Sequence, residues 1–323
     1  MKIDILHTKP DQMNGVYRYS SSLINGLKSE GMNVREIIPR NFSFSIHGKN
    51  IGDWISKKIF LDLRYPVGDI VHSTNHWLVT KHTNIVTIHD IFAELYPQFS
   101  TDEYRRLHMK VLERCKNVDR IVVDSEYVKG TLLPYISENK IKVIHFGVEV
   151  QEPTGDNPYP DDGKLHLLTV GNFGSRKRFD RVYSYLERME NIDLYHIGAV
   201  TVEERYKECL RIQPGNVCYL GYKDDNTMRL YMKYADRFVM DSYAEGYGLP
   251  PLEAMKFGVQ PIVSDIPIFH EMMGNMAYYF TDEESFIDSV MSPENSKTKL
   301  KEFVSQYDDW IKKYISLYEE VIE

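Results

Sequence analysis

The sequence predicts an α/β protein built from two Rossmann-like domains. Short apolar runs alternate with longer amphipathic stretches from end to end, which indicates βαβ units and parallel sheets. The alternation lapses between Glu149 and Gly163, where prolines and glycines stand among Asp and Asn as in a linker. We therefore expect two domains that face each other across a cleft, with ligands at the carboxyl ends of the strands.

Each expected element follows from its apolar pattern. Strands of the first domain are expected at 2–7, 33–38, 69–72, 84–89, 120–124 and 140–145, and helices at 16–30, 101–116 and 126–135. Strands of the second are expected at 164–170, 192–197, 217–220, 237–240, 260–264 and 277–280, and helices at 179–189, 202–212, 227–234 and 252–257.

The last segment, 298–323, has apolar residues three and four positions apart, which predicts one long helix. We expect this helix to cross back and brace the first domain. The expected boundaries are therefore 1–150 for the first domain, 151–303 for the second and 304–323 for the returning helix.

Composition narrows the class of protein. The 42% hydrophobic and 27% charged residues are ordinary for a globular chain. The three cysteines are scattered and form no CxxC pair, which argues against a disulfide framework or zinc site and favours a reducing compartment. Neither a signal peptide nor an apolar run of about 20 residues is present, so a cytoplasmic location is expected.

Charge gives a weaker indication of partners. The net charge is −8, and no concentrated basic patch suggests nucleic-acid binding. The segment 41–66 is basic and aromatic, with Trp54, Lys57 and Lys58, and has no clear period. With the cations of the helix at 101–116, it could contact a lipid-linked acceptor at the inner face of a membrane.

The stretch from Ala244 to Met255 carries two carboxylates, Glu245 and Glu253, with glycines and a Pro-Pro helix start between them. Carboxylates accept hydrogen bonds from vicinal hydroxyls, and free loop amides and a helix N-terminus bind phosphates. The stretch therefore suits a nucleotide sugar, with Glu245 on the loop and Glu253 in the first turn of the helix. The plainer alternative is a pair of surface glutamates favoured by the helix dipole.

A second candidate site follows the first strand of the second domain. There Gly171 and Gly174 precede two adjacent cations, Arg176 and Lys177. These cations are suited to a diphosphate whose negative charge grows as it leaves. A solvated run of charges is the alternative, and the glycines at a strand end make it less attractive.

Two further candidates lie where strands of the first domain end. Gly15, in Asp11-Gln-Met-Asn-Gly15, lets the backbone approach a ligand or simply makes a turn. His89, in Thr87-Ile-His-Asp90, could donate to a sugar hydroxyl, while Asp90 fixes its tautomer or caps the following helix. A lone histidine is more often structural than catalytic, so these residues alone leave the role of His89 open.

Together these stretches resemble the retaining, GT-B-fold enzymes of glycosyltransferase family 4, the glycosyl transferases group 1, and among them the mannosyltransferases. The motifs fall in family order and cover most of the chain: 245–253, 87–90, 124–126, 143–148, 170–177, 220–221 and 263–265. Their combination is specific, although no single motif is. The chain departs from the family in a glycine loop with less glycine, in Asn172 and in Arg178.

The resemblance implies a role for each matching residue. Glu253 would bind the donor ribose, Glu245 would contact the transferred sugar, and Arg176 with Lys177 would hold the diphosphate. The loop Gly246, Tyr247, Gly248 and Leu249 would offer amides to sugar and phosphate, as would Gly171 and Gly174 beside the cations. Gly15 would close over the phosphates, and His89 would reach the donor sugar.

The activity implied is that of a hexosyltransferase that retains anomeric configuration and needs neither a metal ion nor a further cofactor. The donor would be a nucleoside diphosphate sugar, GDP- or UDP-linked, with mannose favoured and glucose next. The acceptor would be a hydroxyl of a glycan or lipid-linked glycan. A UDP-sugar 2-epimerase on the same fold and a non-catalytic sugar-nucleotide binding module are the competing interpretations.

Overall fold

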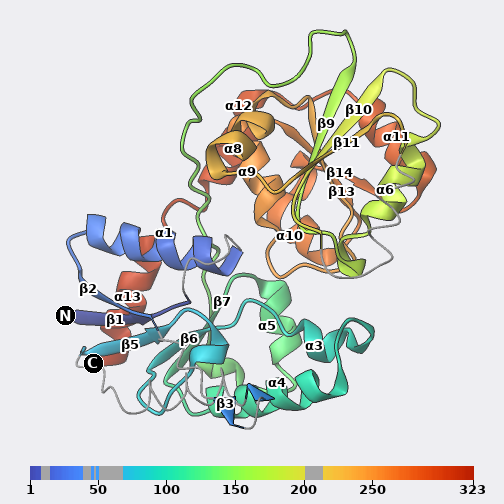
Figure 1. Ribbon diagram of the computed structural model, residues 1–323. Coiled ribbons are helices and arrows are strands. Elements are labelled where there is room, and N and C mark those ends of the chain that lie inside the picture. The colour runs from blue at the N-terminus through green and yellow to red at the C-terminus, as the bar shows by residue number, and fades with distance from the viewer. Residues whose placement is uncertain (9–14, 39–44, 47–48, 51–67, 201–213) are drawn as a thin grey trace. The chain divides into compact units, whose positions relative to one another are not determined.

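The computed structural model of the protein describes residues 1–8, 15–38, 45–46, 49–50, 68–200 and 214–323 (Figure 1). The chain forms two compact units, one of Met1–Phe146 with Asp309–Glu323 and one of Gly147–Asp308. Residues 147–150 and 304–308 therefore lie with the second unit. The expected helix 202–212 and most of the segment 41–66 lie outside the described residues, as does 11–14.

The first unit is a six-stranded parallel sheet in the order β2-β1-β5-β6-β7-β8. The order reverses between β1 and β5, and at such a switch point the connections leave in opposite directions and open a crevice at the carboxyl ends. The strands are β1 Lys2–Leu6, β2 Asn33–Ile37, β5 Ile70–Ser73, β6 Ile85–Thr87, β7 Arg120–Val123 and β8 Ile141–Val143. A separate short antiparallel pair joins β3 Ser45–Ile46 to β4 Lys49–Asn50.

Helices cover this sheet because their apolar stripes face it. The helices are α1 Gly15–Ser29, α3 Phe92–Leu95, α4 Asp102–Cys115, α5 Glu126–Leu132 and α13 Trp310–Ile322. Thr101 and Ser125 cap α4 and α5 by accepting hydrogen bonds from Tyr104 N and Val128 N. Val111, Leu112 and Cys115 of α4 are buried with Val86, Ile121 and Val123 of the sheet.

The second unit is a parallel sheet in the order β11-β10-β9-β12-β13-β14, with its switch point between β9 and β12. The strands are β9 Leu165–Val170, β10 Ile192–Ile197, β11 Val217–Gly221, β12 Arg237–Met240, β13 Gln260–Ser264 and β14 Tyr278–Phe280. The helices are α6 Phe179–Leu186, α8 Asp225–Tyr234, α9 Leu249–Phe257, α10 Pro267–Met273, α11 Glu283–Met291 and α12 Lys297–Ser305.

The hydrophobic core of the second unit is formed by buried side chains from the sheet and from the helices that cover it. Leu167, Leu194, Val239 and Ile262, one from each of four adjacent strands, are almost completely buried in one cluster. α6 adds Phe179, Val182 and Leu186 to that cluster, and α11 adds Phe286 and Val290. The near-continuous apolar runs read from the sequence are therefore buried strands, as expected for parallel sheets covered by helices.

The prediction of one helix over 298–323 is wrong, because two helices, α12 and α13, are separated at residues 306–309. Leu300 and Val304 of α12 are buried in the second unit, whereas Trp310, Tyr314 and Tyr318 of α13 are buried in the first. One straight helix could not serve both cores. Lys256 Nζ, 2.9 Å from Asp308 Oδ1, holds the end of the second unit just before the chain turns. The return of the C-terminal helix to the first unit is confirmed.

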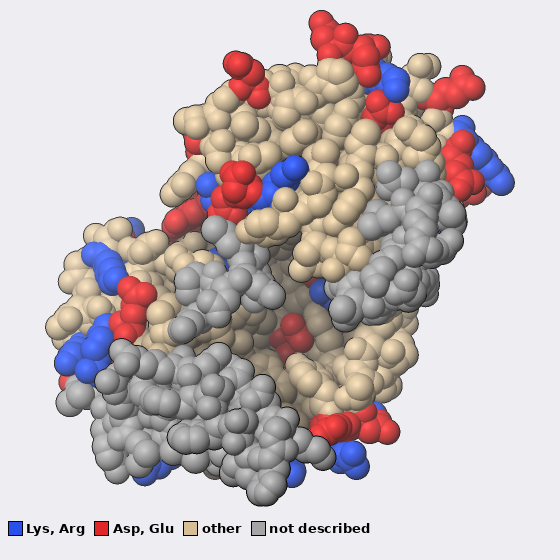
Figure 2. Space-filling model, in the orientation of Figure 1, with Lys and Arg blue, Asp and Glu red and all other residues tan. Residues whose placement is uncertain are grey.

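Two surface properties complete the fold. On the face shown in Figure 2, blue and red side chains are interspersed over the described surface and do not form one basic patch. None of the described helices combines the length and the apolar character that crossing a bilayer requires.

Candidate functional site

The candidate site of the second unit lies at its switch point, where the chain leaves β9 and β12. The loop after β9 carries Gly171–Arg178 and the loop after β12 carries Asp241–Gly248. Tyr243 N donates a 2.7 Å hydrogen bond to Arg176 O, so the two loops are joined through their backbones. The structure thus brings together two stretches that the sequence separates by about 70 positions.

Glu245 occupies the centre of this junction. Its Oε1 lies 2.5 Å from Lys177 Nζ and its Oε2 lies 2.9 Å from Arg176 Nη1. Ser242 Oγ donates to Glu245 Oε1 at 2.5 Å. Arg176 Nη1 also donates to the carbonyl of Ala244. A carboxylate on one loop therefore holds two adjacent cations on the other.

Burial strengthens the electrostatic interactions among these charges. Glu245 is 8% exposed, and burial alone would raise the pKa of its carboxyl. The charges of Lys177 and Arg176 outweigh that effect and lower the pKa of Glu245 from 4.5 to about 2. Burial and the neighbouring Arg176 lower the pKa of Lys177, against the attraction of Glu245. Glu245 is therefore an anion at every pH where the protein would work.

A second ion cluster that the sequence did not single out fixes the same two loops. Asp241, fully buried at the end of β12, lies 2.6 Å from Arg178 Nη2 and 2.5 Å from Arg181 Nε. Arg178 has a φ of 43°, a left-handed conformation that costs a non-glycine residue about 1 kcal/mol. Here the ion pair with Asp241 offsets the strain.

Gly171 stands where the backbone is most crowded. His196 Nε2 lies 2.8 Å from Gly171 O, and a Cβ on Gly198 would lie 1.9 Å from that same oxygen. Gly198 directly follows β10 and was not predicted as a site residue, yet only glycine leaves room for the Gly171 loop. Gly174, by contrast, has open space around it.

The loop 246–248 leads directly into α9. Tyr247 is buried, and Gly248 has a φ of 83°, where an added Cβ would also lie 2.6 Å from Phe269 Cε1. α9 begins at Leu249, three residues earlier than expected, because prolines need no hydrogen-bonding N–H in a first turn. Glu253 is consequently buried in the second turn of α9 and not in its first, which corrects the sequence prediction.

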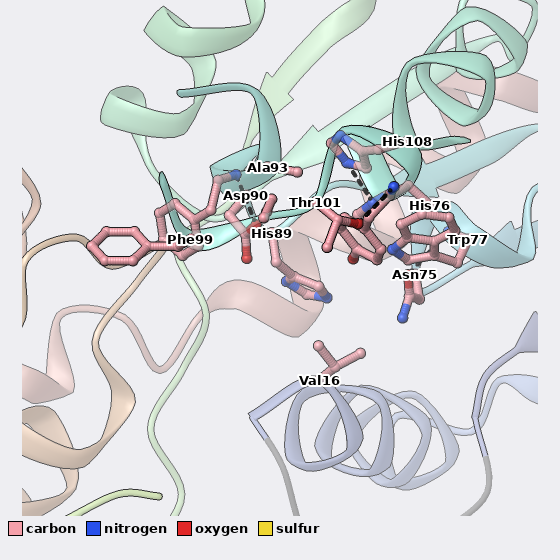
Figure 3. Close-up of a pocket in the computed structure, with 13 residues that line it drawn as sticks. Val16, Asn75, His76, Trp77, His89, Asp90, Ala93, Phe99, Thr101 and His108 are labelled. Atoms are coloured by element: carbon pink, nitrogen blue, oxygen red, sulfur yellow. Dashed lines mark hydrogen bonds between the residues drawn. The ribbon is translucent and has the colours of Figure 1, made fainter. Parts of the chain in front are cut away.

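The remaining predicted residues lie in the first unit. Gly15 is the exposed first residue of α1 and follows the switch-point strand β1. His89 follows β6, and Figure 3 shows its ring directed toward α1. His89 Nδ1 lies 2.5 Å from Asp124 Oδ2, and Nε2 lies 3.0 Å from Thr74 O.

These contacts decide between the two roles that the sequence left open for Asp90. Asp124, after β7, orients the ring, whereas Asp90 Oδ1 accepts a 3.2 Å hydrogen bond from Phe92 N and so caps α3. Burial disfavours the charged ring, but the Asp124 charge and hydrogen bond raise the pKa of His89 above 6.5. With both partners acting as acceptors, both ring nitrogens donate, and a sugar hydroxyl would have to replace Thr74 O.

One group of potential metal ligands occurs among the described residues, away from these loops. Ligand atoms of Asp162, His166 and Asp193 lie within 4.8 Å of one another. They stand at the amino ends of β9 and β10, whereas the candidate site follows the carboxyl ends. Lys164 Nζ, 2.9 Å from Asp193 Oδ2, already balances one of the carboxylates.

Comparison with known proteins defines the class. Residues 156–312 match the family model of the glycosyl transferases group 1. The O-antigen chain mannosyltransferase RfbU of Salmonella typhimurium is 26% identical over 274 residues, which cover 81% of this chain and 73% of RfbU. The serotype-specific mannosyltransferase WbdA of Escherichia coli is 22% identical over 226 residues, 61% of this chain but 28% of WbdA.

The fold has a close structural counterpart. Sucrose-phosphate synthase of Thermosynechococcus elongatus superposes with a TM-score of 0.81 at 16% identity, over 99% of this chain and 98% of that one. The predicted resemblance to the group 1 glycosyltransferases and the predicted GT-B fold of two Rossmann-like units are thus confirmed. The second unit therefore carries a glycosyl transferases group 1 domain, and the chain as a whole is similar to glycosyltransferases.

Proposed function

We propose that the protein transfers a hexose, with retention and without a metal ion, from a nucleoside diphosphate sugar to a hydroxyl of a glycan or lipid-linked glycan. The observation that carries this proposal is the buried contact of Glu245 with Lys177 and Arg176 at the switch point of the second unit. Preorganised cations in a buried site can lower the barrier to departure of an anion by several kcal/mol.

The ion pairs have a simple role in donor binding. In the free protein Glu245 keeps Lys177 and Arg176 side by side despite their mutual repulsion. When the donor binds, its diphosphate oxygens take over part of this pairing. Arg176 can then meet phosphate with two N–H groups, and Lys177 acts as a point charge. The cations supply the charge that a metal ion supplies in other transferases.

The two glutamates would bind opposite ends of the donor. Glu253, buried in α9, would accept hydrogen bonds from the ribose hydroxyls. The backbone of Gly246–Leu249, which enters the N-terminus of α9, would offer N–H groups to phosphate and sugar. Glu245 stays ionised, so it would orient the transferred sugar and stabilise positive charge at its reacting carbon without acting as a proton donor.

Retention would follow from attack on the face from which the diphosphate leaves, with a donor phosphate oxygen taking the acceptor proton. No glycosyl-enzyme is then needed. By the family resemblance, the first unit would bind the acceptor, Gly15 would close over the phosphates and His89 would reach the sugar. A membrane-facing role for 41–66 stays a hypothesis, and charge reversal of Lys57 and Lys58 that leaves liposome binding unchanged would remove it.

The identity of the sugar is supported by the relatives. Two of them are named mannosyltransferases, which makes GDP-mannose the first donor to test and UDP-glucose the second. A thermal-shift screen with GDP, UDP and ADP tests the nucleotide directly, since a ligand that binds only the folded protein raises Tm. A shift with GDP alone is expected, and a shift with UDP alone would transfer the proposal to a UDP-hexose.

Substitution of the site residues tests the mechanism. Lys177→Ala and Glu253→Ala should each lower donor turnover by about two orders of magnitude or more, while the fold survives. Product release from the donor is the measurement, and Glu187→Ala, an exposed glutamate on the same unit, is the control. Near-normal turnover in both variants would contradict the assignment. Nucleotide binding without any transfer would favour a binding module, and release of a free epimerised sugar would favour the epimerase.

A further inference from the structure

The loop that follows β9 is attached to the end of β10 by hydrogen bonds that depart from a regular parallel ladder. The two strands pair side by side as far as Val170 and Ile197 (Figure 1), and Gly171 N still donates to Ile197 O at 2.9 Å. In a regular ladder the Gly171 carbonyl would next accept from Ala199 N. Ala199 N donates instead to the side-chain oxygen of Asn172 at 2.9 Å, so the Gly171 carbonyl bonds to a different donor.

That donor is the side chain of His196, near the end of β10. His196 Nε2 lies 2.8 Å from Gly171 O, and Nδ1 lies 2.8 Å from Tyr183 Oη on α6. A carbonyl oxygen only accepts, so Nε2 carries the proton. Burial lowers the pKa of His196 to about 4, so the ring is neutral near pH 7 and Nδ1 accepts from the Tyr183 hydroxyl. Each ring nitrogen therefore has a fixed role.

Packing alone does not account for a histidine at this position. The ring is fully buried among aromatic side chains, with ring centroids 4.6 Å from Phe173, 4.1 Å from Phe179 and 5.5 Å from Tyr219. An apolar side chain would fill this space without the free-energy cost of removing two ring nitrogens from water. The two hydrogen bonds of His196 are what distinguishes it from such a side chain.

The hydrogen bond to Gly171 O sets the direction of the next amide. A trans peptide unit is planar and its C=O and N–H point opposite ways, and none of the described peptide bonds is cis. His196 thus turns the Asn172 N–H to the opposite side of the peptide unit, where it has no acceptor among the described residues. Gly171 also lies beside Lys177, because an added Cβ would be 3.8 Å from Lys177 Cε. An unpaired N–H and a cation therefore belong to one short loop.

We propose that His196 is a positioning residue for donor binding: it holds the peptide unit of Gly171 and Asn172 so that the Asn172 N–H meets the diphosphate of the nucleotide sugar. This inference rests on the proposed function and adds to it a residue that does not itself touch the donor. A hydrogen bond to an anion is about twice as strong as one between neutral groups. An N–H that is already held in place also loses little conformational freedom when the donor binds.

Two variants at His196 separate the hydrogen bond from the packing. His196→Gln keeps a side-chain N–H for the Gly171 carbonyl and an oxygen that accepts from Tyr183, whereas His196→Leu fills the space with neither. Calorimetric titration with GDP and UDP gives Kd for the nucleotide that wild type binds. His196→Leu should raise that Kd by about tenfold, and His196→Gln should stay within about threefold of wild type.

The matching nucleoside, guanosine or uridine, shows whether the loss is confined to the diphosphate. Its binding, measured by saturation-transfer NMR, should be the same in wild type and His196→Leu, because a nucleoside does not reach the Asn172 N–H. A variant that merely loosens the second unit would weaken both ligands. His166→Leu is the matched control, since His166 is a buried histidine near the amino end of β9, stacked on Tyr159. It should leave the Kd of the diphosphate unchanged.

The ring itself gives a measurement that does not depend on the stability of His196→Leu. Nitrogen NMR of wild type at pH 7, with the His196 signals assigned by their loss in His196→Gln, should show a neutral ring protonated on Nε2. A proton on Nδ1 would overturn the inference. So would a folded His196→Leu that binds the diphosphate like wild type, a His196→Gln as weak as His196→Leu, or equal losses for diphosphate and nucleoside.

The outcome for wild type separates this inference from the proposed function. If wild type turns over the donor and the His196 variants bind the diphosphate equally well, this inference alone fails. If wild type binds neither GDP nor UDP and releases no product from the donor, the proposed function fails and this inference fails with it.

Discussion

The negative charge of Glu245 is stabilised by side chains that the fold brings next to it. Lys177 and Arg176 lie at 2.5 and 2.9 Å, and Ser242 adds a hydrogen bond at 2.5 Å. A buried carboxylate without such partners would protonate. With them its pKa falls to about 2, so Glu245 is an anion near neutral pH and cannot act as a general acid there.

The pH dependence of stability should report this ion cluster. Because the folded pKa of Glu245 lies below the unfolded one, its stabilising contribution is present above about pH 4.5 and is lost as pH falls toward 2. The contribution is on the order of 3 kcal/mol. Glu245→Gln lacks this titration. The difference in free energy of unfolding between wild type and Glu245→Gln should therefore be constant from pH 8 to 5 and shrink below pH 4.5.

Denaturant unfolding at pH 7, 5 and 3.5 measures that difference, since other carboxylates titrate equally in both proteins. Glu187→Gln serves as the control, because Glu187 is an exposed glutamate of the same unit. A Glu245→Gln penalty that is equal at pH 7 and 3.5 would show that the pKa of Glu245 is the same in the folded and unfolded protein, and would contradict the prediction.

The sequence singled out candidate site residues only where they belong to a recognisable motif. It predicted Glu245, Arg176, Lys177 and Glu253, and the structure places the first three in direct contact. It missed Asp241 and Gly198, because an aspartate after a strand and a glycine at a strand end are common anywhere. Their roles arise only when a strand order, not readable from one sequence, puts two loops side by side.

At the scale of elements, α1 and α13 show how closely two helices can approach. An added Cβ on Gly26 of α1 would lie 2.4 Å from Cδ1 and 2.6 Å from Cγ1 of Ile311 on α13. Glycine inside a helix costs about 1 kcal/mol relative to alanine, so its presence here reflects packing. Gly26 thus lets the side chain of Ile311 pack directly on the backbone of α1.

A double-mutant cycle tests this contact. Gly26→Ala should destabilise the protein by about 1–3 kcal/mol through overpacking, and Ile311→Ala by about 2–4 kcal/mol through a cavity. The double variant should cost clearly less than their sum, because the new methyl group fills the space that Ile311 leaves. Additive penalties in urea unfolding would mean that the two positions do not touch.

Element types were predictable from periodicity, whereas element ends were predictable only for some strands. β10, β12 and β13 have the expected bounds, and every residue of these three strands is buried. The division of 298–323 into α12 and α13 could not be seen, because one apolar period runs through both helices. What differs is the core each half faces, and that is a property of the tertiary structure.

At the scale of the whole molecule, the chain leaves the first unit at Phe146 and returns to it at Asp309. α13 closes the first unit with polar contacts as well as apolar ones. Tyr318 Oη lies 2.7 Å from His72 Nδ1, and His72 Nε2 lies 2.9 Å from Thr87 Oγ1. Tyr19 hydrogen-bonds to both Thr87 and Tyr314 and packs edge-on against His89 at 4.7 Å. The last helix, α13, therefore contacts Tyr19, which in turn packs against the predicted site residue His89.

Removal of residues 309–323 should consequently unfold the first unit and spare the second. The deletion exposes a core that includes Trp310, Tyr314 and Tyr318, each buried to 1% exposure or less, whereas all strands of the second unit remain. Calorimetry should show loss of cooperative unfolding for the first unit, with a nucleotide-dependent shift in Tm retained by the second.

Tyr318→Phe is a milder variant. It leaves a buried His72 nitrogen without its hydrogen-bond partner and should lower the free energy of unfolding by about 1–3 kcal/mol. Lys312→Ala, on the exposed side of α13, is the control, and a deletion variant that unfolds like wild type would contradict the bracing role of the helix.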